Sequence, residues 1–349
     1  MDRISTIIKL TTALLVITLF TAGCGSNSST SASADNSPTD SAEKAVSSNN
    51  FPNIDIPAMI NDREQMVNYV AQNFWAEFFS PKRLSALNSV QLKDSSAIIG
   101  VDTAAVNDAL ARYLMVILPQ AELGASVSSL KTLVKKADTL GINGDRRLLL
   151  KIMQLGEYIY YNPNSPYRNE ELYLPVVEEM IAAKSLLDIE KIQFEYPLRM
   201  LKLNRAGTNA NDFQYEELTQ QGALKKGSLY GIKAPFTLIF FNNPGCEACE
   251  QFLDAISNSS ILSGAIESGK VKVLSMYIDE NINDWKGYKA KFPDKWIYAH
   301  DPNMILRDNT IYGIRAIPSV YLLDKDKRVL LKDGGPESIP EIERHVEAI

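Results

Sequence analysis

The sequence predicts a helical amino-terminal domain followed by an α/β carboxy-terminal domain. Over residues 51–203, apolar residues recur at steps of three to five positions, as they do along one face of a helix. Over residues 204–349, nearly continuous apolar runs alternate with amphipathic segments, which is typical of a sheet covered by helices. A chain of 349 residues is long enough to form two hydrophobic cores of ordinary size.

Four to six packed helices are expected in the amino-terminal domain. The clearest periodic segments are 104–118, 127–140, 146–161 and 175–194, and strand-like alternation is absent. An aromatic group could form a binding surface, but its spacing fits a buried stripe better: Tyr69, Phe74, Trp75, Phe78 and Phe79. The domain has neither cysteine nor histidine, so no catalytic site is predicted there.

The carboxy-terminal domain is predicted to alternate strands and helices. Glycines 222, 227 and 231 punctuate a small hairpin at its start. Strands are expected at 236–241, 271–278, 319–323 and 329–332, and helices at 246–257, 285–292 and from residue 338.

Residues 1–24 have the features of an export signal. Charged residues near the start precede an apolar stretch at 10–20 that is too short to span a bilayer permanently. The segment Thr21-Ala22-Gly23-Cys24 resembles a bacterial lipobox, although Thr21 stands where leucine is commonest. That resemblance implies a lipid anchor at Cys24, and hence a periplasm-facing protein of the cell envelope. An uncleaved anchor or an ordinary secretory signal would also export the chain.

Residues 25–50 are mostly Ser, Asn, Ala, Asp and Thr, so a disordered tether is predicted between the anchor and the folded part. Gly25 stands where some bacteria place an aspartate that retains lipoproteins at the inner membrane, which slightly favours the outer membrane. The formal net charge of −6 argues against nucleic acid as a partner, because phosphate binding needs clustered positive charge.

The pair Cys246 and Cys249 is the strongest chemical signal in the chain. It follows the apolar run 236–241 and a Pro244-Gly245 turn, and it opens an amphipathic segment. The first cysteine of such a strand-turn-helix unit lies at a helix N-terminus, where free N–H groups and the helix dipole stabilise a thiolate. The second cysteine lies one turn further on the same face, so it can resolve a mixed disulfide formed at the first.

Residues 205–349 resemble the TlpA/ResA-type branch of the thioredoxin superfamily. The resemblance is carried by Gly207 with Asp212-Phe213, by Phe240-Phe241 before the cysteine pair, and by the segment 313–324 around Pro318. It implies an α/β sandwich with a central mixed sheet and a thiol-disulfide oxidoreductase activity. It also implies that Pro318 is cis beside the dithiol and that Ile317 offers backbone groups to an extended substrate.

The segment 160–170 and the region of Tyr69 and Phe74-Trp75 resemble an uncharacterised helical domain. That domain precedes thioredoxin-like domains in lipoproteins of anaerobic Gram-negative bacteria. This second resemblance covers most of residues 51–200 and implies a domain arrangement without a chemistry.

Several residues depart from the thioredoxin pattern. Gly245 replaces the tryptophan before the first cysteine, and Phe240 occupies the place of a buried aspartate. Glu247 and Glu250 add negative charge near Cys246, which disfavours a second anion there. We therefore expect a reductase or isomerase of protein disulfides, which would need a membrane thiol protein as electron donor because the chain has no second dithiol.

Other classes fit less well. The Thr-x-x-Cys element of a peroxiredoxin is absent, and a zinc site would need ligands beyond the cysteine pair, whereas His300 and His345 are expected at the surface. No metal or other cofactor is predicted. The remaining alternative is a lipid-anchored binding or scaffold protein whose helical domain recruits a ligand or partner, with the dithiol secondary. Replacing both cysteines by serine distinguishes the two functions.

Overall fold

The computed structural model describes residues 50–308 and 310–348 of the chain. The predicted signal segment with Cys24 lies outside the described residues, as does the predicted tether apart from its last residue. Within the described part, no helix combines the length and the apolar character needed to cross a bilayer.

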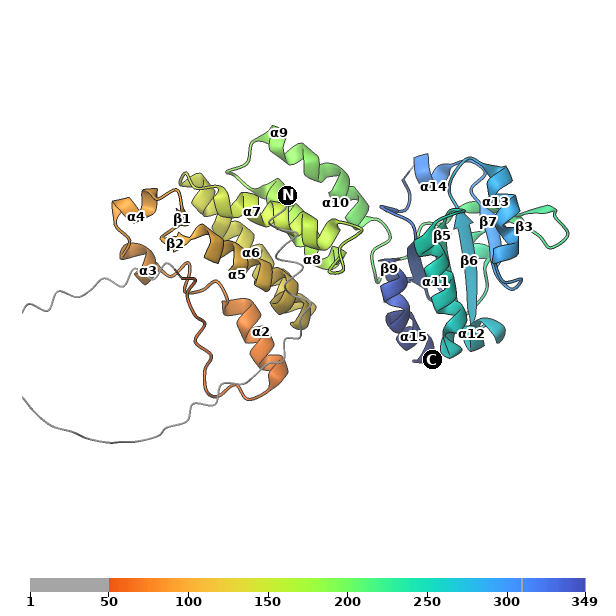
Figure 1. The fold of residues 1–349 in the computed structure, drawn as a ribbon, viewed down its shortest axis with the longest axis horizontal. Coiled ribbons are helices and arrows are strands. Elements are labelled where there is room, and N and C mark those ends of the chain that lie inside the picture. The colour runs from red at the N-terminus through yellow and green to blue at the C-terminus, as the bar shows by residue number, and fades with distance from the viewer. Residues whose placement is uncertain (1–49, 309, 349) are drawn as a thin grey trace, which may run out of the picture. The chain divides into compact units, whose positions relative to one another are not determined.

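The amino-terminal region is built of helices (Figure 1). They are α2 (Arg63–Asn73), α3 (Pro81–Ser85), α4 (Ser89–Lys93), α5 (Thr103–Arg112), α6 (Leu123–Ile142), α7 (Arg147–Gly156), α8 (Glu170–Ala182), α9 (Asp188–Lys191) and α10 (Glu195–Lys202). Two π-helical turns, Tyr113–Ile117 and Glu157–Tyr161, extend α5 and α7. Of the helices that the structure describes here, α2, α5, α6, α7 and α8 have ten residues or more, so five long helices match the predicted four to six.

Most of the predicted aromatic stripe belongs to the core, with Phe79 packed partly buried against it, whereas Tyr69 is only partly buried and lies outside the core cluster. Phe74, Trp75 and Phe78 are buried. Their rings pack against Phe51 and against Tyr113, whose hydroxyl donates a hydrogen bond to the Ala71 carbonyl oxygen at 2.9 Å. Long-range aromatic packing of this kind joins α2 to the turn after α5.

The prediction of one helix over 175–194 was wrong. The chain leaves helical geometry at Ala183 and resumes it at Asp188. Asp138 of α6 accepts hydrogen bonds from the backbone N–H groups of Lys184 and Ser185 at 3.0 and 2.8 Å, which stabilises the non-helical turn. A two-residue β ladder, β1 (Ala97–Ile98) with β2 (Val101–Asp102), was also not predicted, because it is too short to show alternation.

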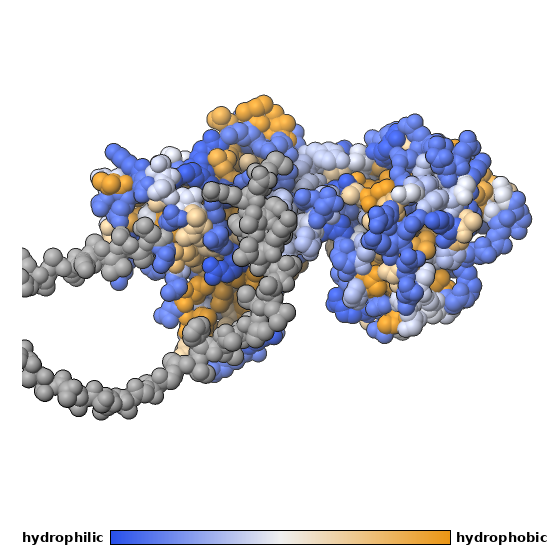
Figure 2. All heavy atoms as spheres, viewed as in Figure 1, coloured by the Kyte–Doolittle hydropathy of each residue, from blue (hydrophilic) through white to orange (hydrophobic). Residues whose placement is uncertain are grey.

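The segment between α8 and α10, which contains α9, also carries exposed apolar side chains. Leu187, Ile189 and Ile192 are exposed, Ile189 by 72%. Figure 2 shows hydrophobic residues gathered on the surface over α9. Leu186 and Phe194, at either end of the same stretch, are buried in the core, so the segment is fixed by its ends and presents its middle to solvent.

The carboxy-terminal region is a seven-stranded mixed sheet of order β4-β3-β7-β6-β5-β8-β9. Its strands are β3 (Gln214–Leu218), β4 (Leu224–Ser228), β5 (Phe236–Asn242), β6 (Val271–Tyr277), β7 (Ile297–His300), β8 (Ser319–Leu323) and β9 (Val329–Gly334). Strands β5, β6 and β7 are parallel, and their neighbours on both sides run antiparallel. This is the central mixed sheet that the sequence resemblance implied.

Side chains of β5 alternate between two cores. Leu238 and Phe240 pack on one face with residues of α11 (Glu247–Asn258), α12 (Ser260–Glu267) and α15 (Ile339–Glu347). Ile239 and Phe241 pack on the other face with Phe213. Since every residue of β5 is buried, the strand is a rigid base for the turn that follows it.

His300 is buried rather than at the surface, which corrects the expectation from sequence. It ends β7, a strand that was not predicted, and only 3% of its surface is exposed. Its ring lies 4.6 Å from that of Trp285 on α13 (Ile282–Tyr288), and Nε2 lies 3.3 Å from Glu216 Oε2 on the neighbouring β3. Burial lowers the pKa of His300 below its ordinary value of 6.5, although Glu216 opposes part of this effect.

This burial makes folding sensitive to mild acid. Below pH 6.5 the unfolded chain takes up a proton on His300 that the folded chain resists, so the free energy of unfolding should fall with falling pH. One such group lowers the free energy of unfolding by at most about 1.4 kcal/mol for each pH unit of acidification. Urea unfolding at several pH values should show that the free energy of unfolding falls less steeply with falling pH for His300→Gln than for the unchanged chain.

His345→Gln is the matched control, since His345 is the other histidine of the chain and lies partly exposed on α15. If the free energy of unfolding falls equally with falling pH in the unchanged chain and in His300→Gln, the acid sensitivity does not come from His300.

Candidate active site

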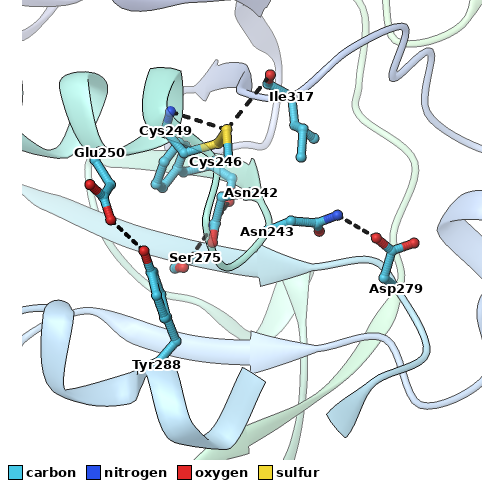
Figure 3. Close-up of a disulfide and its surroundings, with 10 residues drawn as sticks. Asn242, Asn243, Cys246, Cys249, Glu250, Ser275, Asp279, Tyr288 and Ile317 are labelled. Atoms are coloured by element: carbon cyan, nitrogen blue, oxygen red, sulfur yellow. Dashed lines mark hydrogen bonds between the residues drawn. A yellow bond between two sulfur atoms is a disulfide. The ribbon is translucent and has the colours of Figure 1, made fainter. Parts of the chain in front are cut away.

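The cysteine pair lies where β5 passes into α11 (Figure 3). Cys246 is the N-cap residue of α11, and its Sγ accepts the backbone N–H of Cys249 at 3.2 Å. The two cysteines form a disulfide with their Cα atoms 5.2 Å apart. The sulfur of Cys246 therefore occupies the position where unpaired N–H groups and the helix dipole favour negative charge.

The two sulfur-bearing residues differ in access. Cys246 is partly exposed, whereas Cys249 is only 5% exposed and packs in the core beneath α11. A thiol-disulfide exchange partner can therefore approach Cys246 but not Cys249.

Gly245 has a positive φ of 74°, a conformation that residues with a Cβ rarely adopt. This explains why glycine stands at the position that thioredoxin gives to tryptophan. Phe240 is buried and its ring packs 4.9 Å from that of Phe252, so the place of thioredoxin's buried aspartate is filled by hydrocarbon.

Two asparagines that the sequence analysis did not single out fix the turn before Cys246. Asn242 donates to the Phe240 carbonyl oxygen at 2.8 Å and to Ser275 Oγ at 2.9 Å. Asn243 donates to the carboxylate of Asp279, in the loop after β6 (Figure 3). The turn is thereby tied to the neighbouring strand, which holds the start of α11 in one orientation.

The Ile317–Pro318 peptide bond is cis, and this loop lies beside the disulfide. The Ile317 carbonyl oxygen is 3.9 Å from Cys246 Sγ (Figure 3). Pro318 is buried, and Ile317 is partly exposed. The structure thus brings Gly245, Cys246, Cys249, Ile317 and Pro318 together in one place.

The two glutamates of α11 have different surroundings. Glu250 accepts a hydrogen bond from Lys291 Nζ at 2.8 Å and another from the Tyr288 hydroxyl, and these bonds lower its pKa. Glu247 is exposed on the first turn. Lys291 therefore compensates the charge of Glu250, so the expected negative influence on Cys246 rests mainly on Glu247.

A hollow of about 260 Å³ adjoins the dithiol on the side of α13. It is lined by both cysteines together with Glu250, Tyr288 and Lys291, among others. Lys291 and Tyr288 were missed in the sequence because they come close to the cysteines only in the fold. In the described part of the chain, no cluster of three or more His, Cys, Asp and Glu side chains is arranged to hold a metal ion.

A buried cluster of charges supports the loop before Pro318. Arg315 is 9% exposed and its Nη2 lies 2.5 Å from Asp333 of β9 and 3.2 Å from Glu170 of α8. Glu170 also lies 2.7 Å from Lys332 Nζ. Burial would lower the pKa of Arg315, but Asp333 and Glu170 hold it above its ordinary value, while burial raises the pKa of Glu170.

Comparison with known proteins agrees with this fold. A family model described as a domain of unknown function (DUF5106) matches residues 24–204. The crystal structure of a thioredoxin-like protein from Bacteroides caccae is 31% identical, with 85% of this chain and 98% of that chain covered at a TM-score of 0.71. The chain belongs to this thioredoxin-like family with a DUF5106 domain.

Two further solved structures, both from Bacteroides fragilis, match part of the chain. One is the carboxy-terminal domain of an uncharacterized protein, with 38% identity, 41% of this chain and 98% of that chain covered, and a TM-score of 0.38. The other is a conserved protein of unknown function, with 33% identity, 40% and 98% covered, and a TM-score of 0.37. No curated protein matches the chain. We refer to residues 204–349 as the thioredoxin-like domain and to the helices before them as the DUF5106 domain.

The difference in access predicts the order of alkylation. After reduction, iodoacetamide should modify Cys246 at least about tenfold faster than Cys249, because the partly exposed sulfur at the helix N-terminus is the better nucleophile. Mass spectrometry of peptides from quenched time points measures both rates. Equal rates, or faster modification of Cys249, would contradict this description of the pair.

Lys291 should influence the dithiol through Glu250. Lys291→Gln leaves the Glu250 carboxylate uncompensated beside the hollow, which destabilises a thiolate in the reduced pair and makes the reduction potential roughly 10–20 mV more negative. Equilibration with thiol buffers measures this shift. Lys289→Gln is the control on the same turn, since Lys289 does not line the hollow. A shift of the reduction potential in Lys289→Gln but not in Lys291→Gln would refute the influence of Lys291 on the dithiol.

Proposed function

We propose that this protein is a thiol-disulfide oxidoreductase that reduces or isomerises disulfides of other proteins. The observation that supports this most directly is the division of labour within the cysteine pair. Cys246 is partly exposed at a helix N-terminus, and Cys249 is buried within bonding distance of it. A purely structural disulfide would not need one accessible sulfur at the site most favourable for a thiolate.

In the proposed reaction, the reduced chain reacts first at Cys246. Its thiol loses a proton to solvent, and the thiolate attacks one sulfur of a substrate disulfide, so that a mixed disulfide forms and the other substrate sulfur leaves as a thiolate. Cys249 then loses its proton and attacks the Cys246 sulfur. This step releases the second substrate thiolate and forms the Cys246–Cys249 disulfide that the structure contains.

We further propose that the protein works in the cell envelope, facing the periplasm. A lipid anchor at Cys24 would hold it at a membrane, with the outer membrane slightly favoured, and a membrane thiol protein would return two electrons to the disulfide after each reductive cycle. The exposed negative charge of Glu247 favours the reducing direction over the oxidising one, because a nearby negative charge destabilises the thiolate of the reduced pair.

The reduction potential of the Cys246–Cys249 pair tests this direction. A value close to that of thioredoxin, about −270 mV, is expected for a reductase, whereas one near about −120 mV would identify an oxidant. The potential is measured by equilibrating the protein in thiol buffers and counting alkylated cysteines by mass. A pair that cannot be reduced and reoxidised under these conditions would refute the redox function.

A Cys246→Ser, Cys249→Ser double variant distinguishes the redox function from a binding function. If the protein acts by thiol-disulfide exchange, the double variant no longer reduces the disulfides of insulin and loses its function in cells. A binding protein keeps its cellular function without the cysteines.

A further inference from the structure

A groove next to the dithiol lies between Ala248, the residue before Cys249, and the DUF5106 domain. It encloses about 320 Å³. One side is formed by the thioredoxin-like domain: Ala248 between the two cysteines, Ala316–Pro318 and Pro336-Glu337. The opposite side is formed by residues 163–166 and Arg168, which lie in the connection between the π-helical turn after α7 and helix α8. We call residues 162–169 the DUF loop.

Hydrogen bonds within the DUF loop make it rigid. Ser165 Oγ donates to the Ile159 carbonyl oxygen at 2.5 Å, and the Ser165 N–H donates to the Asn162 carbonyl oxygen at 2.9 Å. At the far end, the Asn169 N–H donates to the Tyr160 carbonyl oxygen at 2.9 Å. Both ends of the loop are therefore fastened to the same helical turn, so its shape is preorganised rather than adjustable.

Contacts at both ends also fasten the DUF loop to the thioredoxin-like domain. Before the loop, the Arg315 guanidinium stacks 4.5 Å from the centroid of the Tyr161 ring and donates to the Tyr161 carbonyl oxygen. Within the loop, Arg168 Nη2 lies 2.5 Å from Glu337 Oε1. Arg315 lies two residues before Ile317, so the loop and the segment that carries the cis peptide bond are held against each other.

We propose that the DUF loop is the second wall of the substrate groove and that it selects extended polypeptides with small or apolar side chains next to the reacting cysteine. This proposal rests on the proposed thiol-disulfide exchange. It assigns to the DUF5106 domain a direct part in substrate selection.

The lining of the groove supports this kind of substrate. Four prolines and two alanines present small apolar surfaces to the groove: Pro163, Pro166, Pro318, Pro336, Ala248 and Ala316. The charged pair Arg168 and Glu337 is mutually compensated, so it offers no net charge to a charged side chain. The groove also reaches Ile317, whose carbonyl oxygen lies 3.9 Å from Cys246 Sγ, so a polypeptide bound there runs past the reacting sulfur.

The test compares two disulfide probes with the same leaving group. One is the mixed disulfide of thionitrobenzoate with the peptide Ala-Ala-Cys-Ala-Ala, and the other is the mixed disulfide of thionitrobenzoate with free cysteine. The protein is the full chain with Cys24→Ser and Cys249→Ala, so that Cys246 is the remaining thiol. Its thiolate attacks the cysteine sulfur of the probe, a new S–S bond forms, and thionitrobenzoate leaves with the electron pair and is measured by its absorbance.

Asn164→Trp and Pro166→Trp place an indole at exposed, groove-lining positions of the DUF loop. Each should lower the ratio of the peptide rate to the cysteine rate roughly tenfold, because the bulky ring occupies the space of the residues that flank the substrate cysteine. Tyr167→Trp is the matched control, since Tyr167 is exposed in the same loop but does not line the groove. It should leave the ratio unchanged.

The outcomes are distinct. The proposal is overturned if the ratio of the peptide rate to the cysteine rate in both groove variants stays within about twofold of its value for the unsubstituted loop. It is also overturned if Tyr167→Trp lowers this ratio as much as the groove variants do. If the protein with the unsubstituted DUF loop reacts with neither probe, the proposed thiol-disulfide exchange at Cys246 is refuted. The assignment of the groove, which rests on that exchange, is then refuted as well. Circular dichroism of all three variants checks that the fold is retained.

Discussion

The environment of Arg315 is the constraint on which the rest of the structure most depends. Its guanidinium is almost completely buried, and a buried cation is tolerated only when carboxylates and hydrogen bonds replace the lost water. One carboxylate comes from β9 and the other from α8, so the cation can be satisfied only when both regions of the chain are in place. Leaving such a charge without its partner costs about 3–5 kcal/mol. The same side chain supports the loop before Pro318, so the neighbourhood of the cysteines is coupled to the packing of the DUF5106 domain.

The local features of the site could be predicted from sequence because each depends on residues close together in the chain. A buried strand, a glycine that can adopt positive φ and a cysteine that caps a helix occur within about a dozen positions, and the periodicity of the following segment predicts the helix. The burial of the aromatic residues directly after α2 could be predicted for the same reason. In these segments local preference and tertiary packing favour the same structure.

The features that escaped prediction depend on partners far away in the chain. His300 is polar and ends a strand of four residues, and its burial depends on Trp285 and on the neighbouring β3. The break after α8 depends on Asp138, more than forty positions earlier. Lys291 and Arg315 are ordinary basic residues in the sequence, and only the fold brings Lys291 to Glu250 and Arg315 to Glu170. No pattern of a single segment carries such information, because spacing reports on one face of one element.

The position of the DUF loop also has an evolutionary consequence. The residues that set the chemistry of the dithiol belong to α11 and to the segment around Pro318, whereas residues 163–166 and Arg168 precede Cys246 by about eighty positions in the chain. Substitutions in that stretch can accumulate without touching a sulfur, a helix cap or the cis peptide bond. Duplicated genes could therefore diverge in the proteins that they serve while inheriting the same redox machinery unchanged.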